Sequence, residues 1–107
     1  MFPTTPYDFP TIMVLGICRI EFRIHQSTSL KMKRQVLKSI IGKVKARFNA
    51  SIAEVGGNEL WQRAEVGISV VGNDRVFVNS VLDKIVNYIE SLNSAEIVDY
   101  TVEIENR

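Results

Sequence analysis

Two hydrophobic periodicities alternate along this chain, and together they predict its elements. From Thr11 to Gln26 every second position between Ile12 and Ile24 is apolar or glycine. One fully apolar face indicates a strand that packs on a layer of helices. The other face changes from apolar to polar halfway, so we place it on the open side of a sheet. The run is long for a small sheet, and we expect a bend near Gly16 or an end that projects.

The stretch Ser29 to Asn49 changes to a helical period. Its apolar residues recur three and four positions apart: Leu30, Leu37, Ile40, Ile41, Val44 and Phe48. Ser27, Thr28 and Ser29 are the N-cap candidates, because a hydroxyl there can accept a hydrogen bond from the first turn. Gly42 lies in the helix interior, where glycine costs about 1 kcal/mol relative to alanine. We expect close packing at Gly42, or simple tolerance.

The remaining elements follow from the same two periods, with a loop at Gly56-Gly57-Asn58. They are a strand at Ser51 to Val55, a strand at Gln62 to Gly72, a helix at Asp74 to Leu92 and a strand at Glu96 to Glu105. In the last strand we expect Val98, Tyr100, Val102 and Ile104 to face the helices.

The element order is β-α-β-β-α-β, which predicts an α+β, ferredoxin-like fold. In that fold a four-stranded antiparallel sheet carries both helices on one face. Right-handed crossovers put the first and third strands in the middle. A chain of 107 residues is one domain's worth. We therefore expect a Pro-rich N-terminal arm at 1–10 and a single domain at 11–107.

Charge is divided unevenly between the two halves of the chain. Residues 1–50 carry nine Lys and Arg against two Asp and Glu, whereas residues 51–107 carry four against ten, giving +7 and −6. The helix at Ser29 to Asn49 has no acidic residue. One interpretation is a dipolar surface whose basic side meets an anionic partner. The other is that these charges neighbour each other in space and cancel.

The start of the basic helix is the candidate anion- or RNA-binding site. Backbone N–H groups and the positive end of the helix dipole favour phosphate at such a position. The candidate residues are Ser29, Lys31, Lys33, Arg34, Lys38 and Lys45. The alternative is a capped helix with a solvated basic face.

The open face of the sheet suggests a second kind of contact. The apolar run Met13, Leu15 and Ile17 is the candidate oligomer face, because solvent-exposed apolar patches mark interaction sites. Farther along, we expect Arg19, Glu21, Arg63, Glu65 and Glu103 to form a cross-strand charge lattice. Acidic residues there disfavour base stacking of the RNA-recognition-motif kind. We interpret Trp61 as closing the edge of the core, with base stacking as the alternative.

The sequence predicts no catalytic or metal-binding motif. Cys18 lies in the apolar strand and is interpreted as a core residue, consistent with a reduced, cytoplasmic setting. His25 is the only histidine, and alone it cannot form a histidine-based metal site. Walker, dinucleotide and CxxC motifs do not occur, so we expect a non-enzymatic protein without a cofactor. No apolar window is long enough for a membrane span, and the first ten residues lack a signal-peptide pattern.

Several motifs together resemble the YlxP-like family of uncharacterised bacterial proteins. They are SLKMKR at 29–34, RFNASIAEV at 47–55, LWQRAEVGISVV at 60–71 and ND at 73–74. The resemblance runs from about Met13 to Ile104. Met32 stands where the family often has an acidic residue, and the Pro-rich arm is an addition.

The resemblance implies a ferredoxin-like fold, a bacterial cytoplasmic setting and genes often placed among those for translation and ribosome maturation. It implies no established activity. With the charge pattern, it favours a non-enzymatic RNA- or ribosome-associated binding module that uses the basic helix. The alternative is a protein-interaction or homo-oligomerisation module without nucleic-acid binding.

Overall fold

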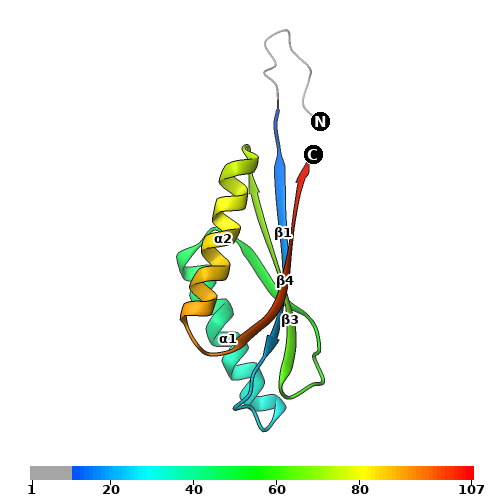
Figure 1. Ribbon diagram of the computed structural model, residues 1–107, viewed down its shortest axis with the longest axis vertical. Coiled ribbons are helices and arrows are strands. Elements are labelled where there is room, and N and C mark those ends of the chain that lie inside the picture. The colour runs from blue at the N-terminus through cyan, green and yellow to red at the C-terminus, as the bar shows by residue number, and fades with distance from the viewer. Residues whose placement is uncertain (1–10) are drawn as a thin grey trace, which may run out of the picture.

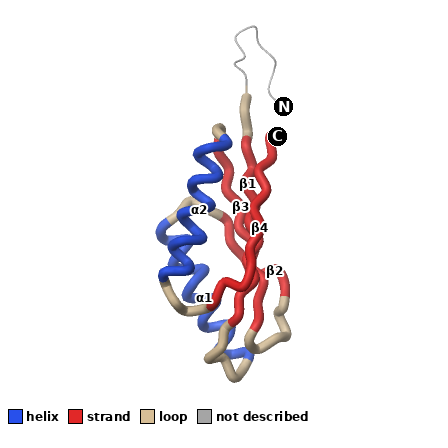
Figure 2. The backbone as a smooth tube through the Cα atoms, in the orientation of Figure 1, coloured by secondary structure: helices blue, strands red, loops and turns tan. Residues whose placement is uncertain are grey.

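The computed structural model describes residues 11–107, and the predicted Pro-rich arm lies outside them. The elements are β1 (Val14–Arg23), α1 (Leu30–Arg47), β2 (Ser51–Gly56), β3 (Arg63–Gly72), α2 (Arg75–Ser91) and β4 (Glu96–Asn106). The strands form one sheet in the order β2-β3-β1-β4, and all three pairings are antiparallel. Both helices lie on the same side of this sheet (Figures 1 and 2). The predicted ferredoxin-like α+β fold, with the first and third strands in the middle, is confirmed.

Of the three cap candidates before α1 the structure uses Ser29, and Asp74 caps α2. The Ser29 hydroxyl accepts a hydrogen bond from the Met32 amide at 3.1 Å, and the Asp74 carboxylate accepts one from the Phe77 amide at 2.8 Å. Each bond satisfies an amide that the first turn of a helix leaves without a backbone partner. The two caps therefore fix where each helix begins after the strand that precedes it.

The core lies between the sheet and the two helices. It is built from the alternate residues of the strands that face the helices and from the apolar stripes of α1 and α2. Its largest fully buried apolar side chains are Phe22, Ile20, Ile24, Ile40, Leu82, Ile85 and Ile89. The open face of the sheet has no helix against it within residues 11–107 (Figure 1).

A register shift changes which residues of β4 face the helices. Glu21 pairs with Asp99, whereas the next residue, Phe22, pairs with Ile97. Val98 is the extra residue of this irregularity and is 48% exposed, while Ile97 packs against the core. The expectation that Val98 faces the core is therefore wrong, because a bulge reverses the alternation on one side of it. The irregularity lies opposite Glu21 and Phe22 of β1.

Gly16 and Gly42 occupy opposite environments. A Cβ atom on Gly16 would lie 2.5 Å from Val78 Cγ1 and 2.9 Å from Leu82 Cδ1, so β1 and α2 approach closely there. A Cβ atom on Gly42 would have no atom within 4 Å among the residues outside its own helical neighbourhood. The close packing considered for Gly42 is therefore absent, and that property belongs to Gly16.

Alanine at these two glycines should change stability in opposite directions. Gly16→Ala is expected to destabilise the fold by roughly 1–3 kcal/mol, because the added methyl group overpacks the interface between β1 and α2. Gly42→Ala is expected to stabilise it by up to about 1 kcal/mol, because alanine is the better helix former. Urea unfolding of both variants measures this. Shifts of the same sign would contradict the assigned environments.

Cys18 is a core residue, as interpreted from the sequence, and its side chain is fully buried. Burial, with a smaller contribution from the charge of Asp83, raises the pKa of the Cys18 thiol from 9.0 to about 11. The folded chain therefore keeps the thiol protonated at pH values where the unfolded chain ionises it. The resulting stabilisation is present below pH 9.0 and is lost as the pH rises towards about 11.

Alkaline unfolding should expose this contribution of Cys18. Two pKa units correspond to roughly 3 kcal/mol, so stability should fall by up to that amount between pH 9 and pH 11. The matched variant Cys18→Ala lacks the thiol and should show a shallower decline over the same range. Urea unfolding at several pH values gives both slopes, and equal slopes would contradict the prediction.

Candidate functional site

Four basic side chains lie in one row along the outer side of α1. Lys31, Arg34, Lys38 and Lys45 are all exposed. At 3.6 residues per turn they fall within about 60° of one another, and at 1.5 Å per residue they extend over about 21 Å. Within residues 11–107 none of the four forms an ion pair. We call these four residues the basic stripe.

Gly42 interrupts the basic stripe between its last two members. It lies in the same angular sector of the helix as Lys38 and Lys45, and the space beside its backbone is open. A glycine at such a point lets another molecule approach the helix backbone closely. The basic stripe is therefore positively charged and also locally flat.

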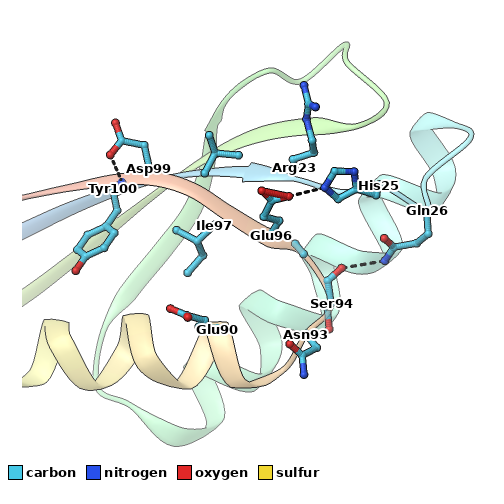
Figure 3. Close-up of a pocket in the computed structure, with 12 residues that line it drawn as sticks. Arg23, His25, Gln26, Glu90, Asn93, Ser94, Glu96, Ile97, Asp99 and Tyr100 are labelled. Atoms are coloured by element: carbon cyan, nitrogen blue, oxygen red, sulfur yellow. Dashed lines mark hydrogen bonds and ion pairs between the residues drawn. The ribbon is translucent and has the colours of Figure 1, made fainter.

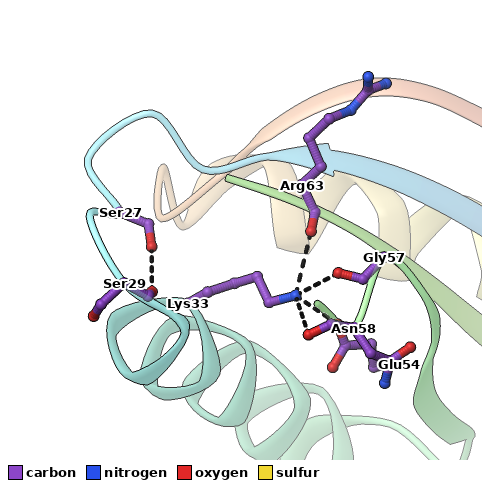
Figure 4. Close-up of polar contacts among 7 residues, drawn as sticks. All are labelled: Ser27, Ser29, Lys33, Glu54, Gly57, Asn58 and Arg63. Carbon is purple, nitrogen blue, oxygen red and sulfur yellow. Dashed lines mark hydrogen bonds and ion pairs between the residues drawn. The ribbon is translucent and has the colours of Figure 1, made fainter. Parts of the chain in front are cut away.

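Lys33 was predicted to belong to the same surface, and the structure corrects this. Its side chain is completely buried and points towards the loop between β2 and β3 (Figure 4). Its position explains the burial, because Lys33 falls in the three-four spacing of the apolar residues Leu30, Leu37 and Ile40. Its ammonium group is consequently not available to an anionic partner.

The buried ammonium of Lys33 is surrounded by oxygen atoms (Figure 4). The nitrogen lies 3.1 Å from a carboxylate oxygen of Glu54 and 2.7 Å from the Gly57 carbonyl. The carbonyls of Asn58 and Arg63 follow at 3.3 and 3.4 Å. Three N–H donors thus serve four acceptors. The group ties α1 to both ends of the β2–β3 loop and has a structural function.

Glu54 is the residue that the sequence interpretation missed in this network. It shares the helix-facing side of β2 with Ile52, which pairs with Ile68 in the core. A lysine in the apolar stripe of a helix and a glutamate on the apolar side of the next strand are each exceptions to their pattern. Buried charges are nearly always paired. The two exceptions together could therefore have predicted that Lys33 pairs with Glu54.

The hydroxyl groups of Ser27 and Ser29 at the start of α1 are both bonded within the chain. The Ser29 hydroxyl already caps the helix by accepting from Met32, and the Ser27 hydroxyl donates to the Ser29 carbonyl at 2.9 Å. His25 binds Glu96 of β4 instead of the helix start. The phosphate contact at Ser29 stays a prediction, and the exposed cations of α1 form the basic stripe.

The open face of the sheet carries an apolar half and a charged half. Met13, Leu15 and Ile17 lie on it as predicted, and Val71, which pairs directly with Leu15, adds an exposed apolar side chain. Next to Ile17 a hollow of about 630 Å³ extends over β1, β3 and β2.

In the charged half, Arg63 forms an ion pair with Glu21, and Arg19 lies 3.7 Å from Glu65. These four residues therefore form the predicted lattice, whereas Glu103 forms no ion pair within residues 11–107. Each of these ion pairs joins a residue of the first half of the chain to one of the second half, as the pair of Lys33 and Glu54 does.

A second hollow, of about 580 Å³, lies along the edge strand β4 (Figure 3). His25 Nε2 lies 2.5 Å from a carboxylate oxygen of Glu96, and the Gln26 amide donates to the Ser94 carbonyl at 2.9 Å. Within residues 11–107 no serine, threonine or cysteine side chain is hydrogen-bonded to His25. The hollow thus contains polar groups that are paired with each other and offers no activated nucleophile.

The described part of the chain lacks two further kinds of site. Residues 11–107 contain no group of three or more His, Cys, Asp or Glu side chains placed to hold a metal ion. Neither described helix is long and apolar enough to cross a membrane.

The interpretation of Trp61 also needs correction. Its side chain is 56% exposed and does not belong to the buried core. Leu60, the residue before it, is 51% exposed. The Trp-Gln pair leads into β3, but the ring does not close the edge of the core. The base-stacking alternative therefore becomes relevant again.

Comparison with solved structures gives matches with TM-scores below 0.5. The de novo designed protein Foldit4 matches with a TM-score of 0.49 and 18% identity, over 89% of this chain and 96% of that chain. A C-terminal segment of the alpha subunit of aIF2 from Pyrococcus abyssi matches with a TM-score of 0.46 and 10% identity, over 95% of this chain and 53% of that chain.

Comparison with protein families and curated sequences gives closer relationships. A family model described as "Protein of unknown function (DUF503)" matches residues 15–102. "Uncharacterized protein YlxP" of Bacillus subtilis (strain 168) is 37% identical over 83 residues, which cover 78% of this chain and 90% of that protein. The chain therefore belongs to the DUF503 family of proteins of unknown function, as its resemblance to YlxP-like proteins predicted.

Proposed function

We propose that this protein is a non-enzymatic RNA-binding module that contacts phosphate groups through the basic stripe of α1. The observation that carries the proposal is the set of four exposed cations on one side of a helix, without an ion pair in residues 11–107. Exposed helices usually mix both charge signs at positions i and i+4. A row of cations of one sign attracts a polyanion and releases its counterions on binding.

The mode of binding follows from the side chains that are available. Lysine acts on phosphate as a point charge, whereas arginine can bind two oxygens at once. Phosphate contacts set position and carry little sequence information. The protein should thus bind many RNAs with similar affinity, and ribosomal RNA is the partner that the family resemblance favours.

Fluorescence anisotropy with a labelled, structured RNA tests this function. At about 50 mM salt we expect binding in the range of roughly 1 to 100 μM, which is typical of sequence-independent contacts. Binding should weaken steeply as salt is added. Absence of binding at low salt would overturn the proposal.

The open sheet face supports a second candidate function, which is self-association. Its supporting observation is the apolar half of that face, where Met13 and Val71 are 44% and 62% exposed and no helix of residues 11–107 covers them. The neighbouring Arg19 and Glu65 would let two copies pair opposite charges across a twofold axis. RNA binding and self-association use opposite sides of the molecule and are compatible.

Sedimentation equilibrium of the unmodified protein and of Leu15→Glu tests self-association. If the open face joins two copies, the unmodified protein should be dimeric at tens of micromolar and the variant monomeric. A monomer at all concentrations would exclude this candidate. The same variant should bind RNA unchanged, because Leu15 alternates with the buried Val14 and so lies on the face of the sheet away from the helices.

A further inference from the structure

The loop between β2 and β3 is fixed more firmly than a simple connection requires. The Leu60 amide donates to the Gly57 carbonyl at 2.9 Å, which closes a tight turn. The buried Lys33 ammonium binds the carbonyls of Gly57 and Asn58 (Figure 4). Gly57 has φ +74°, and a Cβ atom there would lie 3.1 Å from the Arg63 carbonyl oxygen. Only glycine fits this combination of backbone angle and space.

The far end of the loop is attached to the segment that joins β1 to α1. The Gln62 side-chain amide donates to the carbonyls of His25 and Ser27, at 3.2 and 3.0 Å. The Ile24 amide donates to the Gln62 carbonyl at 2.8 Å. Both ends of residues 57–62 are thus bonded to the part of the molecule where α1 begins. Leu60 and Trp61 lie between these two anchors.

The fixed turn displays two large apolar side chains. Leu60 and Trp61 are each more than half exposed, and Trp61 is the only tryptophan of the chain. Exposing a tryptophan forgoes the stabilisation that its burial would give. An aromatic ring on an ordered turn loses little conformational entropy when it binds a partner. The arrangement is that of a preorganised contact.

Charge in this part of the molecule indicates the chemistry of the partner. Arg34 follows the buried Lys33 along α1, and with Lys31 it begins the basic stripe at the end of α1 that Lys33 ties to the loop, on another side of the helix. The turn itself carries the acidic Glu59, which repels phosphate. A partner with anionic groups for the stripe and flat apolar groups for the turn fits both surfaces. RNA with unpaired bases has these two features.

We propose that Trp61 stacks on an unpaired base of an RNA strand whose phosphates lie along the basic stripe. This inference rests on the proposed RNA-binding function and adds a substrate class to it. RNA that is single-stranded or looped is preferred over a continuous duplex, because bases within a duplex already stack on each other. Base stacking on an aromatic ring is tolerant of sequence.

The single tryptophan makes the test direct. A labelled single-stranded 12-nucleotide RNA and a blunt RNA duplex are titrated at low salt, with binding followed by anisotropy of the label and by tryptophan emission. We expect the single strand to quench Trp61 emission with the same midpoint as the anisotropy change. Trp61→Ala should weaken binding of the single strand by about five- to a hundredfold, the range found for base–aromatic contacts. Trp61→Phe should retain most of the affinity.

Leu60→Ala is the matched control, because it removes a neighbouring apolar side chain that has no aromatic face. It should weaken binding less than Trp61→Ala does. The inference is overturned if RNA binds without a change in Trp61 emission and Trp61→Ala binds as tightly as the unmodified protein. The proposed RNA-binding function would survive that outcome, whereas failure of any RNA to bind would overturn both. A shift of Trp61 emission with protein concentration alone would assign the turn to self-association and overturn the inference.

Discussion

Lys33→Met is expected to destabilise the protein by roughly 3–5 kcal/mol, although methionine has a similar volume. The substitution removes the ammonium group that pairs with Glu54, whose side chain is only 19% exposed, and that binds three backbone carbonyls. Breaking a buried ion pair on one side leaves an uncompensated charge, which accounts for a cost of this size. Carbonyls left without donors add to it. Urea unfolding followed by circular dichroism measures the change.

Lys31→Met is the matched control for this prediction. It makes the same chemical change two residues earlier in α1, at an exposed side chain, and should alter stability by no more than about 0.5 kcal/mol. The double variant Lys33→Met/Glu54→Leu should recover part of the loss, because it removes the unpaired carboxylate as well. Equal effects of Lys33→Met and Lys31→Met would show that the buried ammonium contributes no more to the free energy of unfolding than an exposed one does.

Reversing the four charges of the basic stripe is expected to abolish RNA binding while the fold persists. The variant carries glutamate at positions 31, 34, 38 and 45. At about 1.5 kcal/mol for each lost charge-assisted contact, affinity should fall on the order of a thousandfold or more. The helix should tolerate the change, since all four side chains are exposed and glutamate near a helix N-terminus interacts favourably with the dipole. Anisotropy gives the affinity, and circular dichroism with urea unfolding gives the stability.

Lys43→Glu with Lys84→Glu is the control for overall charge. Lys43 lies on α1 about 120° away from Lys31, and Lys84 lies on α2. Both side chains are exposed, and neither belongs to the basic stripe. Their reversal should weaken binding by a much smaller factor, through the general field of the molecule. If this control loses as much affinity per charge as the stripe variant does, binding does not depend on the stripe.

The fold was predictable because its patterns are local and mutually consistent. The period-two run of β1, the helical stripes and the caps Ser29 and Asp74 each specify one element, and chirality rules then allow few arrangements. The error at Val98 has a physical cause. A bulge needs only one extra residue in one strand, and apolar residues at Ile97 and Val98 give no local sign of which one turns inward.

The candidate site was predictable only in part. Lys31, Arg34, Lys38 and Lys45 were identified from their helical spacing, and the structure shows that they share one exposed side. Lys33 was grouped with them by its charge, although its spacing matched the core. The exposure of Trp61 depends on how Lys33 and Gln62 anchor a loop across the fold. Such long-range contacts leave no periodic signal in the sequence, so the display of Trp61 required the structure.

The salt dependence of RNA binding by Lys38→Ala and Lys43→Ala tests the role of the basic stripe most directly. Each neutralised phosphate contributes about 0.7–0.9 to the slope of log K against log salt. If Lys38 contacts a phosphate, Lys38→Ala should reduce the slope of the unmodified protein by about one unit. Lys43→Ala, on another side of the same helix, should leave it unchanged. An unchanged slope for Lys38→Ala, or an equal reduction for both variants, would contradict the proposal that α1 binds RNA through this stripe.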